Sequence, residues 1–238
     1  MQNTAKKRIT RCETGPEKRV YIMKETIEAK ENLTKRQLQA LKTKNKIYQA
    51  AVQEINEKGF NNVNIEDITK AAEVAKGTFY VHFDSKEAII LYTFEHSDEI
   101  YEEAYEKIEG ESFLDMAVHF VRYSYREYEK RGKGIIRAMI ANYFHFEDYQ
   151  IYSHDRGLYK CLLKIVREGK KQGVLDTDTP SEYYADMLLS TMVGVEVMWC
   201  FDDLGRSLAE MMEDAILVTA IGLTGVEEHG EQEESHAS

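Results

Sequence analysis

Only two prolines, Pro16 and Pro180, interrupt this chain of 238 residues. Between its few glycines lie long stretches rich in Ala, Leu, Ile, Glu, Lys and Met, which favour helices over strands. Proline breaks helices and glycine weakens them, so their positions mark where helices end. The sequence therefore predicts an all-α fold, and its length is ample for a real hydrophobic core.

Charge is distributed unevenly along the chain. Residues 1–46 contain 13 Lys and Arg against five Glu, whereas the remainder contains 18 Lys and Arg against 37 Asp and Glu, so that +8 and −19 make up the net charge of −11. A basic end on an acidic body indicates either a polyanion-binding end or a solvated basic tail. We expect residues 1–42 to be a basic extension, either a partly disordered arm or a helix that forms on binding, with Met23 as an alternative start. We expect residues 227–238 to be a disordered acidic tail.

Three short helices are expected after this extension. The first runs from about Lys44 to Lys58 and ends at Gly59 in a Schellman-type cap. The second has Asn64 as its N-cap with Asp67 at its third position, and it ends near Glu73. The third spans only about residues 76–83 and is too short to hold by propensity alone, so Phe79 and Phe83 must clamp it by packing.

Longer helices are expected to follow. The fourth is capped by Ser85 and runs to about Glu109 without Gly or Pro. Further helical stretches lie near residues 112–130, 134–146, 155–172, 181–203 and 207–224.

The second and third helices are joined by about three residues, 73–75, which is the layout of a helix-turn-helix. If Phe79 and Phe83 point inward, then Gly77, Thr78 and Val81 point outward and are slim enough to let the backbone approach base edges. Lys76, Tyr80 and His82 flank them and can donate hydrogen bonds to phosphates. The same pattern also fits any three-helix globule, so geometry alone leaves both interpretations open.

The stretch Lys76-Gly77-Thr78-Phe79-Tyr80-Val81-His82-Phe83-Asp84-Ser85-Lys86-Glu87-Ala88-Ile89 closely resembles the signature of the TetR (tetracycline-repressor-like) family of transcriptional regulators. The likeness covers about residues 44–91. It implies an all-α protein with an N-terminal three-helix helix-turn-helix DNA-binding domain over 43–88. It also implies a C-terminal helical effector-binding and dimerisation domain over 89–226.

The resemblance also implies roles for individual residues. The residues that would face bases are Lys76, Gly77, Thr78 and Val81, and those that would hold phosphates are Tyr80, His82 and Lys86. The DNA backbone would be contacted at the starts of two helices by Lys44 and Asn64. Two positions depart from the family pattern. Glu73 stands where the family often has Gly, and Glu66 stands where some relatives have a base-reading basic residue.

The last two long helices are the expected homodimer surface, since two heads on a two-fold axis read a palindromic operator. Apolar residues recur there at helical spacing, and we expect the interface to contain Leu188, Met192, Val195, Met211, Ala215 and Val218. The alternative is that these faces serve only the core of one protomer.

The middle helices are rich in aromatic residues, which line ligand pockets but more often fill cores. We expect an effector pocket, for an apolar or aromatic small molecule, among His119, Phe120, Tyr123, Met139, Asn142, Tyr143, Phe146, Tyr159, Met192 and Trp199.

These features predict a cytoplasmic, ligand-responsive transcriptional regulator that a small molecule releases from DNA. The alternative is an effector-independent DNA-binding architectural or cell-division factor. No phosphate loop, nucleophile elbow, metal-ligand spacing or apolar run of a membrane span is recognised, so we expect no enzyme, cofactor, metal or membrane partner.

Overall fold

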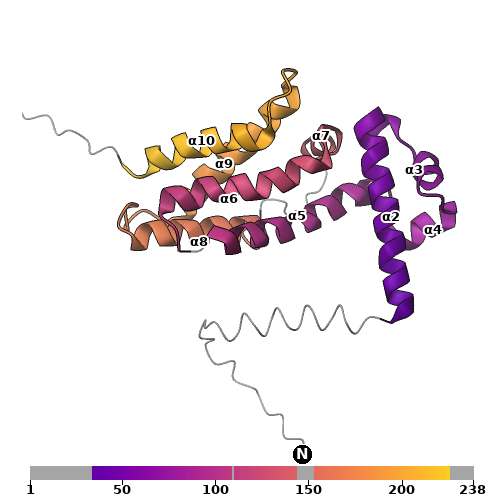
Figure 1. The fold of residues 1–238 in the computed structure, drawn as a ribbon, viewed down its shortest axis with the longest axis horizontal. Helices are drawn as coiled ribbons and strands as arrows, with labels where there is room; N and C mark the ends of the chain where they lie inside the picture. The colour runs from indigo at the N-terminus through magenta and orange to yellow at the C-terminus, as the bar shows by residue number, and fades with distance from the viewer. Residues whose placement is uncertain (1–33, 109, 144–152, 226–238) are drawn as a thin grey trace, which may run out of the picture. The chain divides into compact units, whose positions relative to one another are not determined.

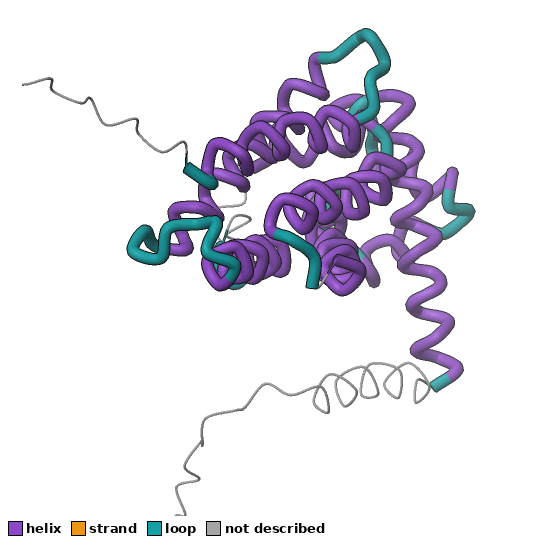
Figure 2. Tube along the Cα trace, turned by 60° about the vertical axis from the view of Figure 1, so that its left-hand side comes forward, coloured by secondary structure: helices purple, strands orange, loops and turns teal. Residues whose placement is uncertain are grey.

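A computed structural model of the chain describes residues 34–108, 110–143 and 153–225, and the regular elements within those ranges are all helical (Figure 1). Figure 2 shows the described residues as helices joined by loops, without a strand. In chain order the elements are α2 (Lys35–Lys58), the 3-10 turn η1 (Phe60–Asn62), α3 (Ile65–Ala71), α4 (Lys76–His82), α5 (Glu87–Ile108), α6 (Phe113–Tyr128), the 3-10 turn η2 (Glu129–Arg131), α7 (Lys133–Asn142), α8 (Gly157–Lys171), α9 (Ser181–Phe201) and α10 (Leu208–Leu223). The all-α prediction is confirmed.

The first described helix begins earlier than the sequence analysis predicts. α2 starts at Lys35, nine residues before Lys44. The backbone N–H of Gln37 donates to Thr34 Oγ1, and the backbone N–H of Thr34 donates to Gln37 Oε1. This reciprocal pair is a capping box, which satisfies two backbone donors at a helix start. The predicted start at Lys44 is therefore wrong.

Gly59 ends α2, but without the predicted Schellman cap. Its φ of 81° and ψ of 148° lie outside the left-handed helical conformation, and its N–H makes an ordinary helical bond of 2.9 Å to Ile55 O. Because ψ is extended, the chain turns away directly into η1.

The chain divides into two compact units, residues 1–46 and 47–238. The described residues of the first unit are Thr34 and the first part of α2, residues 35–46. The second unit contains the rest of α2 and all later helices. Residues 1–33 and 226–238, which hold most of the expected extension and the expected tail, lie outside the described residues.

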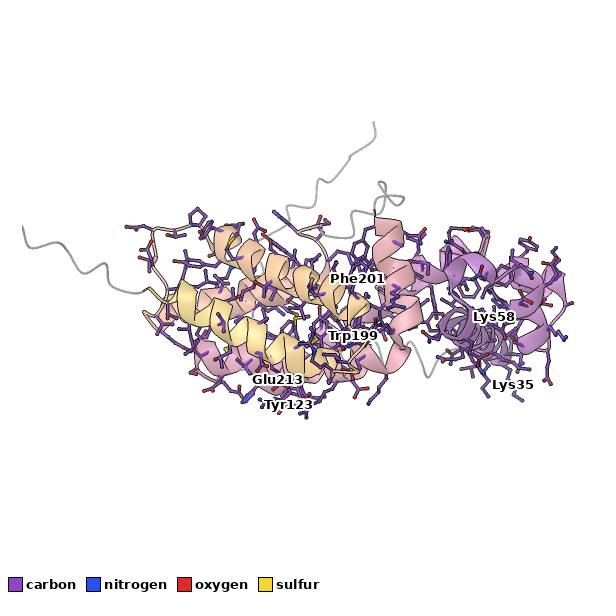
Figure 3. All side chains as sticks on the ribbon, turned by 90° about the horizontal axis from the view of Figure 1, so that it is seen from above. Lys35, Lys58, Tyr123, Trp199, Phe201 and Glu213 are labelled. Atoms are coloured by element: carbon purple, nitrogen blue, oxygen red, sulfur yellow. The ribbon has the colours of Figure 1, made fainter. Side chains whose placement is uncertain are left out.

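Within the second unit, α5, α6, α8, α9 and α10 lie alongside one another in a bundle (Figure 1). α10 packs on α6 and α9, and polar contacts fix its register. Glu129 Oε2 accepts hydrogen bonds from Ser207 Oγ and from the N–H of Ala209 at the start of α10. Glu213 of α10, labelled in Figure 3, pairs with Arg122 of α6 at 2.8 Å.

α9 is long and apolar enough to cross a membrane by length and composition alone, which is more than the sequence analysis expects. It nevertheless packs against α7, α8 and α10 and includes the buried Glu196. These contacts are those of a core helix.

The structure corrects part of the expected dimer surface. Leu188 and Met192 are 1% and 0% exposed, so they belong to the core of the protomer. Val195, Met211 and Ala215 are half-buried, and Val218 is exposed. α9 has apolar residues on all sides, so its hydrophobic spacing could not indicate which side faces outward.

Replacing Gly134 with alanine should destabilise the second unit. A Cβ there would lie 2.6 Å from Asn56 Cα and 2.8 Å from Ile55 O, and these backbone atoms cannot rotate away. We expect Gly134→Ala to lower the free energy of unfolding in urea by about 1–3 kcal/mol. The control is Gly77→Ala, whose Cβ meets nothing within 4 Å and should stabilise α4 by about 0.5–1 kcal/mol. Equal stability of Gly134→Ala and the wild type would contradict the close packing.

Candidate nucleic-acid interface and core cavity

α3 and the turn after it set the direction of α4. Asn64 caps α3 as predicted, since its side chain accepts from the N–H of Asp67 and Asp67 accepts from the N–H of Asn64. Glu73, in the turn, has a φ of 50°, the one positive φ of a described non-glycine residue. The turn therefore tolerates a side chain where the family often has glycine.

α4 is only seven residues long and is held from behind by two phenylalanines. Phe79 and Phe83 are buried, with ring centroids 5.9 Å apart, and Phe83 meets the edge of Tyr92 at 5.5 Å. The opposite face is open, with Val81 78% and Tyr80 46% exposed and with Gly77 also exposed. Thr78 and His82 are half-buried beside them. The inward and outward faces are those that the sequence predicts.

Lys76, at the start of α4, forms an ion pair with Glu66 of α3. Hydrogen bonding to the Lys76 ammonium lowers the pKa of Glu66, and the same bond raises the pKa of Lys76. Both side chains are exposed, so the pair lies at the protein surface. Glu66 thus holds the ammonium that the sequence analysis assigns to base recognition.

Lys86 has a different environment from the predicted phosphate contact. Its ammonium donates to Phe60 O at 2.6 Å and to Val63 O at 2.8 Å, and it lies 4.2 Å from the centre of the Phe60 ring. These contacts tie the start of α5 to the segment between α2 and α3. At most one N–H of Lys86 remains for a phosphate.

Lys44, another predicted DNA contact, lies on α2 in the first unit.

A cavity of about 40 Å³ lies inside the second unit, bordered by α5, α6, α8 and α9. Its lining is mostly aromatic and apolar with a few polar groups: Phe94, Ser97, Asp98, Tyr101, Tyr125, Tyr128, Tyr143, Arg156, Leu158, Leu189, Met192, Val193 and Glu196. Two residues of the expected effector pocket, Tyr143 and Met192, are among them.

The other residues of the expected pocket are not in this lining. Phe120 and Met139 are buried elsewhere in the core, and Tyr123 is exposed on α6. The rest have local hydrogen-bond partners: His119 with Glu111, Asn142 with Ala138 O, Tyr159 with Asp186 and Trp199 with Arg206 O. Phe146 lies outside the described residues.

Glu196 is the lining residue that the sequence analysis missed. It is buried in α9, where it accepts hydrogen bonds from Tyr125 Oη at 2.6 Å and Tyr143 Oη at 3.1 Å. Burial raises the pKa of Glu196 to about 7, and burial together with the Glu196 charge raises the pKa of Tyr125. A single carboxylate within the apolar stretch from Leu188 to Trp199 was the available signal, because a charge inside a core helix needs a partner.

A hydrogen-bonded junction connects the wall of this cavity to α2. Asn56 of α2 donates from Nδ2 to Arg131 O at 2.7 Å and accepts at Oδ1 from the N–H of Ile135 at 3.0 Å. The guanidinium of Arg131 donates to Thr93 O and to Ser97 Oγ, and it lies 5.2 Å from the centre of the Tyr128 ring. Ser97 and Tyr128 line the cavity. Arg131 therefore contacts both the cavity wall and Asn56 of α2.

Within residues 34–108, 110–143 and 153–225, no group of three or more His, Cys, Asp or Glu side chains is arranged to hold a metal ion. Burial raises the pKa of Cys161 to about 12 and that of Cys200 to about 11, so neither thiol ionises readily at neutral pH.

Residues 47–93 match the model of a family described as bacterial regulatory proteins, tetR family. An uncharacterised HTH-type transcriptional regulator of Bacillus subtilis, YvdT, is 53% identical over 45 residues, which are 19% of this chain and 23% of that protein. The chain spans less than a quarter of the length of the first curated relatives it matches. The HTH-type transcriptional regulator UidR of Escherichia coli is 24% identical over 71% of this chain and 88% of its own length.

Solved structures share the fold over most of the chain. The fatty acid degradation regulator FadR from Bacillus halodurans has a TM-score of 0.66 at 21% identity, covering 76% of this chain and 96% of its own. FadR from Bacillus subtilis, in complex with stearoyl-CoA, has a TM-score of 0.62 at 20% identity, covering 76% of this chain and 98% of its own.

Removing Glu66 should strengthen binding to duplex DNA irrespective of its sequence. In Glu66→Gln the Lys76 ammonium is free to neutralise one more phosphate, so the slope of log affinity against log salt concentration should steepen by about 0.9. Fluorescence anisotropy with a random duplex at several salt concentrations measures this slope. Glu57→Gln, which removes one negative charge from α2 without freeing Lys76, is the control. The same slope in both variants would contradict the assigned role of the pair.

Glu196 should make the protein less stable as the pH rises. The folded protein keeps the Glu196 proton up to about pH 7, whereas a carboxyl of pKa 4.5 in the unfolded chain loses it earlier. The unfolded state therefore binds fewer protons between these values, and stability should fall by an amount on the order of 3 kcal/mol. Urea unfolding of the wild type and of Glu196→Gln, measured between pH 4.5 and about pH 7, isolates the contribution of Glu196 to stability. An identical pH dependence of both proteins would contradict it.

Proposed function

We propose that this chain, whose residues 47–93 match the tetR family of bacterial regulatory proteins, is a transcriptional repressor that a small molecule releases from a palindromic DNA operator. The observation that carries the proposal is the short α4 helix, whose buried face is pinned by Phe79 and Phe83 and whose opposite face is slim and exposed. A helix presented in this way can enter the major groove. The region that contains it, residues 47–93, is the one that matches the family.

The proposed DNA contacts follow from this face. Gly77, Thr78 and Val81 lie nearest to the bases, and Tyr80 and His82 donate to phosphates on either side. Asn64 uses its Oδ1 to cap α3, so its Nδ2 is the group that would donate to the backbone. Lys76 reaches a base or phosphate after leaving Glu66, and Lys44 and the basic residues before it add affinity through counterion release.

Dimerisation would place two such helices on one operator. Apolar side chains are exposed on α9, on α10 and in the loop between them, among them Met198, Phe201, Leu204, Val218 and Ile221. Phe201 and Leu204 are 75% and 84% exposed, and Figure 3 shows Phe201 at the end of α9. A surface of this kind is costly in water unless a partner covers it. In the proposed homodimer, α9 and α10 of each protomer form a four-helix bundle with those of its mate.

The effector would occupy the cavity bordered by α5, α6, α8 and α9, so that residues 43–88 serve as the DNA-binding domain and residues 89–226 as the effector-binding and dimerisation domain. Because the cavity is small, a ligand can enter it only if aromatic side chains of its lining move. Displacement of Tyr128 or Ser97 would move Arg131, and Arg131 O is one of the two groups that hold Asn56. The position of α2, and with it the spacing of the two DNA-binding heads, would then change.

This mechanism is allosteric only if the ligand binds the released state more tightly than the DNA-bound state. DNA then lowers the affinity of the protein for the ligand by the same factor by which the ligand lowers its affinity for DNA. Such a repressor works in the cytoplasm, where it meets the chromosome.

Selection of bound fragments from genomic DNA by the full chain tests DNA recognition. The chain should enrich a palindrome, and the double variant Thr78→Ala, Tyr80→Ala should lose about tenfold to a hundredfold in affinity for it, because a base contact and a phosphate contact are removed. Circular dichroism should show an unchanged helical fold, since neither side chain is buried. The proposal would be wrong if the selection enriched no particular sequence, or if the double variant bound the palindrome with the affinity of the wild type. Release of the palindrome by a metabolite separates a repressor from an effector-independent DNA-binding factor.

A charge on the exposed apolar face should break the dimer. Val218 is 72% exposed on α10, so Val218→Glu leaves the protomer core intact and places a carboxylate in the proposed interface. Sedimentation should show a monomer. The affinity for the palindrome should fall because a single DNA-binding domain contacts only one half-site. Val174→Glu, on the exposed loop after α8, should remain dimeric. A dimer in both variants would place the interface elsewhere.

A further inference from the structure

The cavity contains a carboxyl group without a cationic partner. Glu196 is 5% exposed, and its hydrogen-bond donors are the hydroxyls of Tyr125 and Tyr143. Within the described residues no Lys, Arg or His forms an ion pair with it. Two phenols stabilise a carboxylate less than a cation does, so the site remains poorly compensated when Glu196 is ionised.

The one basic residue in the cavity lining is already engaged. Arg156 donates from Nε to Asp98 Oδ2 at 2.8 Å and from Nη2 to Phe94 O at 2.8 Å. The other oxygen of that carboxylate, Asp98 Oδ1, is buried and has no hydrogen-bond partner among the described residues. The lining therefore contains two carboxyl groups and one guanidinium, and both the charge of Glu196 and the lone pairs of Asp98 Oδ1 call for a donor that the protein does not supply.

Aromatic rings surround the same space. Phe94, Tyr101, Tyr125, Tyr128 and Tyr143 all border the cavity with Glu196. A cation near aromatic faces is attracted by their quadrupoles, and the attraction is larger where water is excluded. A carboxylate among aromatic rings is the chemistry that binds organic ammonium ions.

We propose that the effector cavity takes an organic cation, a compact ammonium group attached to an apolar or aromatic body, with Glu196 as its counter-ion and Asp98 Oδ1 as a second acceptor. The inference rests on the proposed function of this cavity and names the class of its ligand. The cavity of about 40 Å³ has room for about three waters, so only a compact head group fits without rearrangement. Because the charge of Arg156 is paired with that of Asp98, an acyl-CoA or another anion finds no unpaired positive charge in this lining. The ligand class therefore differs from that of the stearoyl-CoA complex with the same fold.

Binding of three matched probes to the full chain tests the proposal by calorimetry in the absence of DNA. The probes are 2-phenylethylamine, which is a cation at neutral pH, the neutral 2-phenylethanol and the anionic phenylacetate, with lauroyl-CoA as a fourth. The cation should bind at least about tenfold more tightly than the neutral probe, and the anion and the acyl-CoA should bind more weakly than either. This selectivity is measured on the wild type and does not depend on the folding of a variant.

Glu196→Gln should lower the affinity for 2-phenylethylamine by about tenfold or more and leave that for 2-phenylethanol within about twofold. Glu127→Gln, on the exposed face of α6, should change neither. Tightest binding of lauroyl-CoA or phenylacetate, equal binding of cation and alcohol, no binding of the cation, or a cation affinity insensitive to Glu196→Gln would each overturn the proposal. Because no DNA is present, these outcomes are independent of whether the chain binds an operator.

Discussion

The position of the end of α2 depends on the side-chain amide of Asn56. It bonds to the chain on both sides of the Gly132–Gly134 segment, which keeps the end of α2 against the start of α7. The fit is close enough that a Cβ at Gly132 would lie 2.5 Å from the Asn56 amide. A helix held by both a donor and an acceptor has little freedom to slide, so movement at this segment must change the position of α2.

Arg131 extends this constraint into the interior. Its carbonyl holds Asn56, while its guanidinium binds α5 at Thr93 and Ser97 and lies over the ring of Tyr128. Two of these residues line the cavity, so one arginine links the cavity wall to α2. The sequence does not indicate this link, because hydrogen bonds between residues about 75 positions apart leave no local pattern.

What could be predicted from the sequence was local. Asn64 with Asp67 and the spacing of Phe79 and Phe83 each fix a helix end or a buried face within a few residues, and the structure contains them as predicted. The capping box of Thr34 and Gln37 is equally local, and it lies before the predicted start of the helix at Lys44. Where one helix is apolar on every side, as in α9, periodicity cannot indicate its outward face, and the expected pocket and interface therefore contain core residues such as Met192.

In the proposed mechanism, the cavity and the operator affect each other through Asn56. The most direct measurement is the affinity of the full chain for its selected operator, with and without a saturating small molecule that releases it, in the wild type and in Asn56→Ala. The small molecule should weaken operator binding by at least about fivefold in the wild type. In Asn56→Ala it should still bind but change the operator affinity by less than about twofold. An undiminished effect in the variant would show that Asn56 does not couple the cavity to the operator.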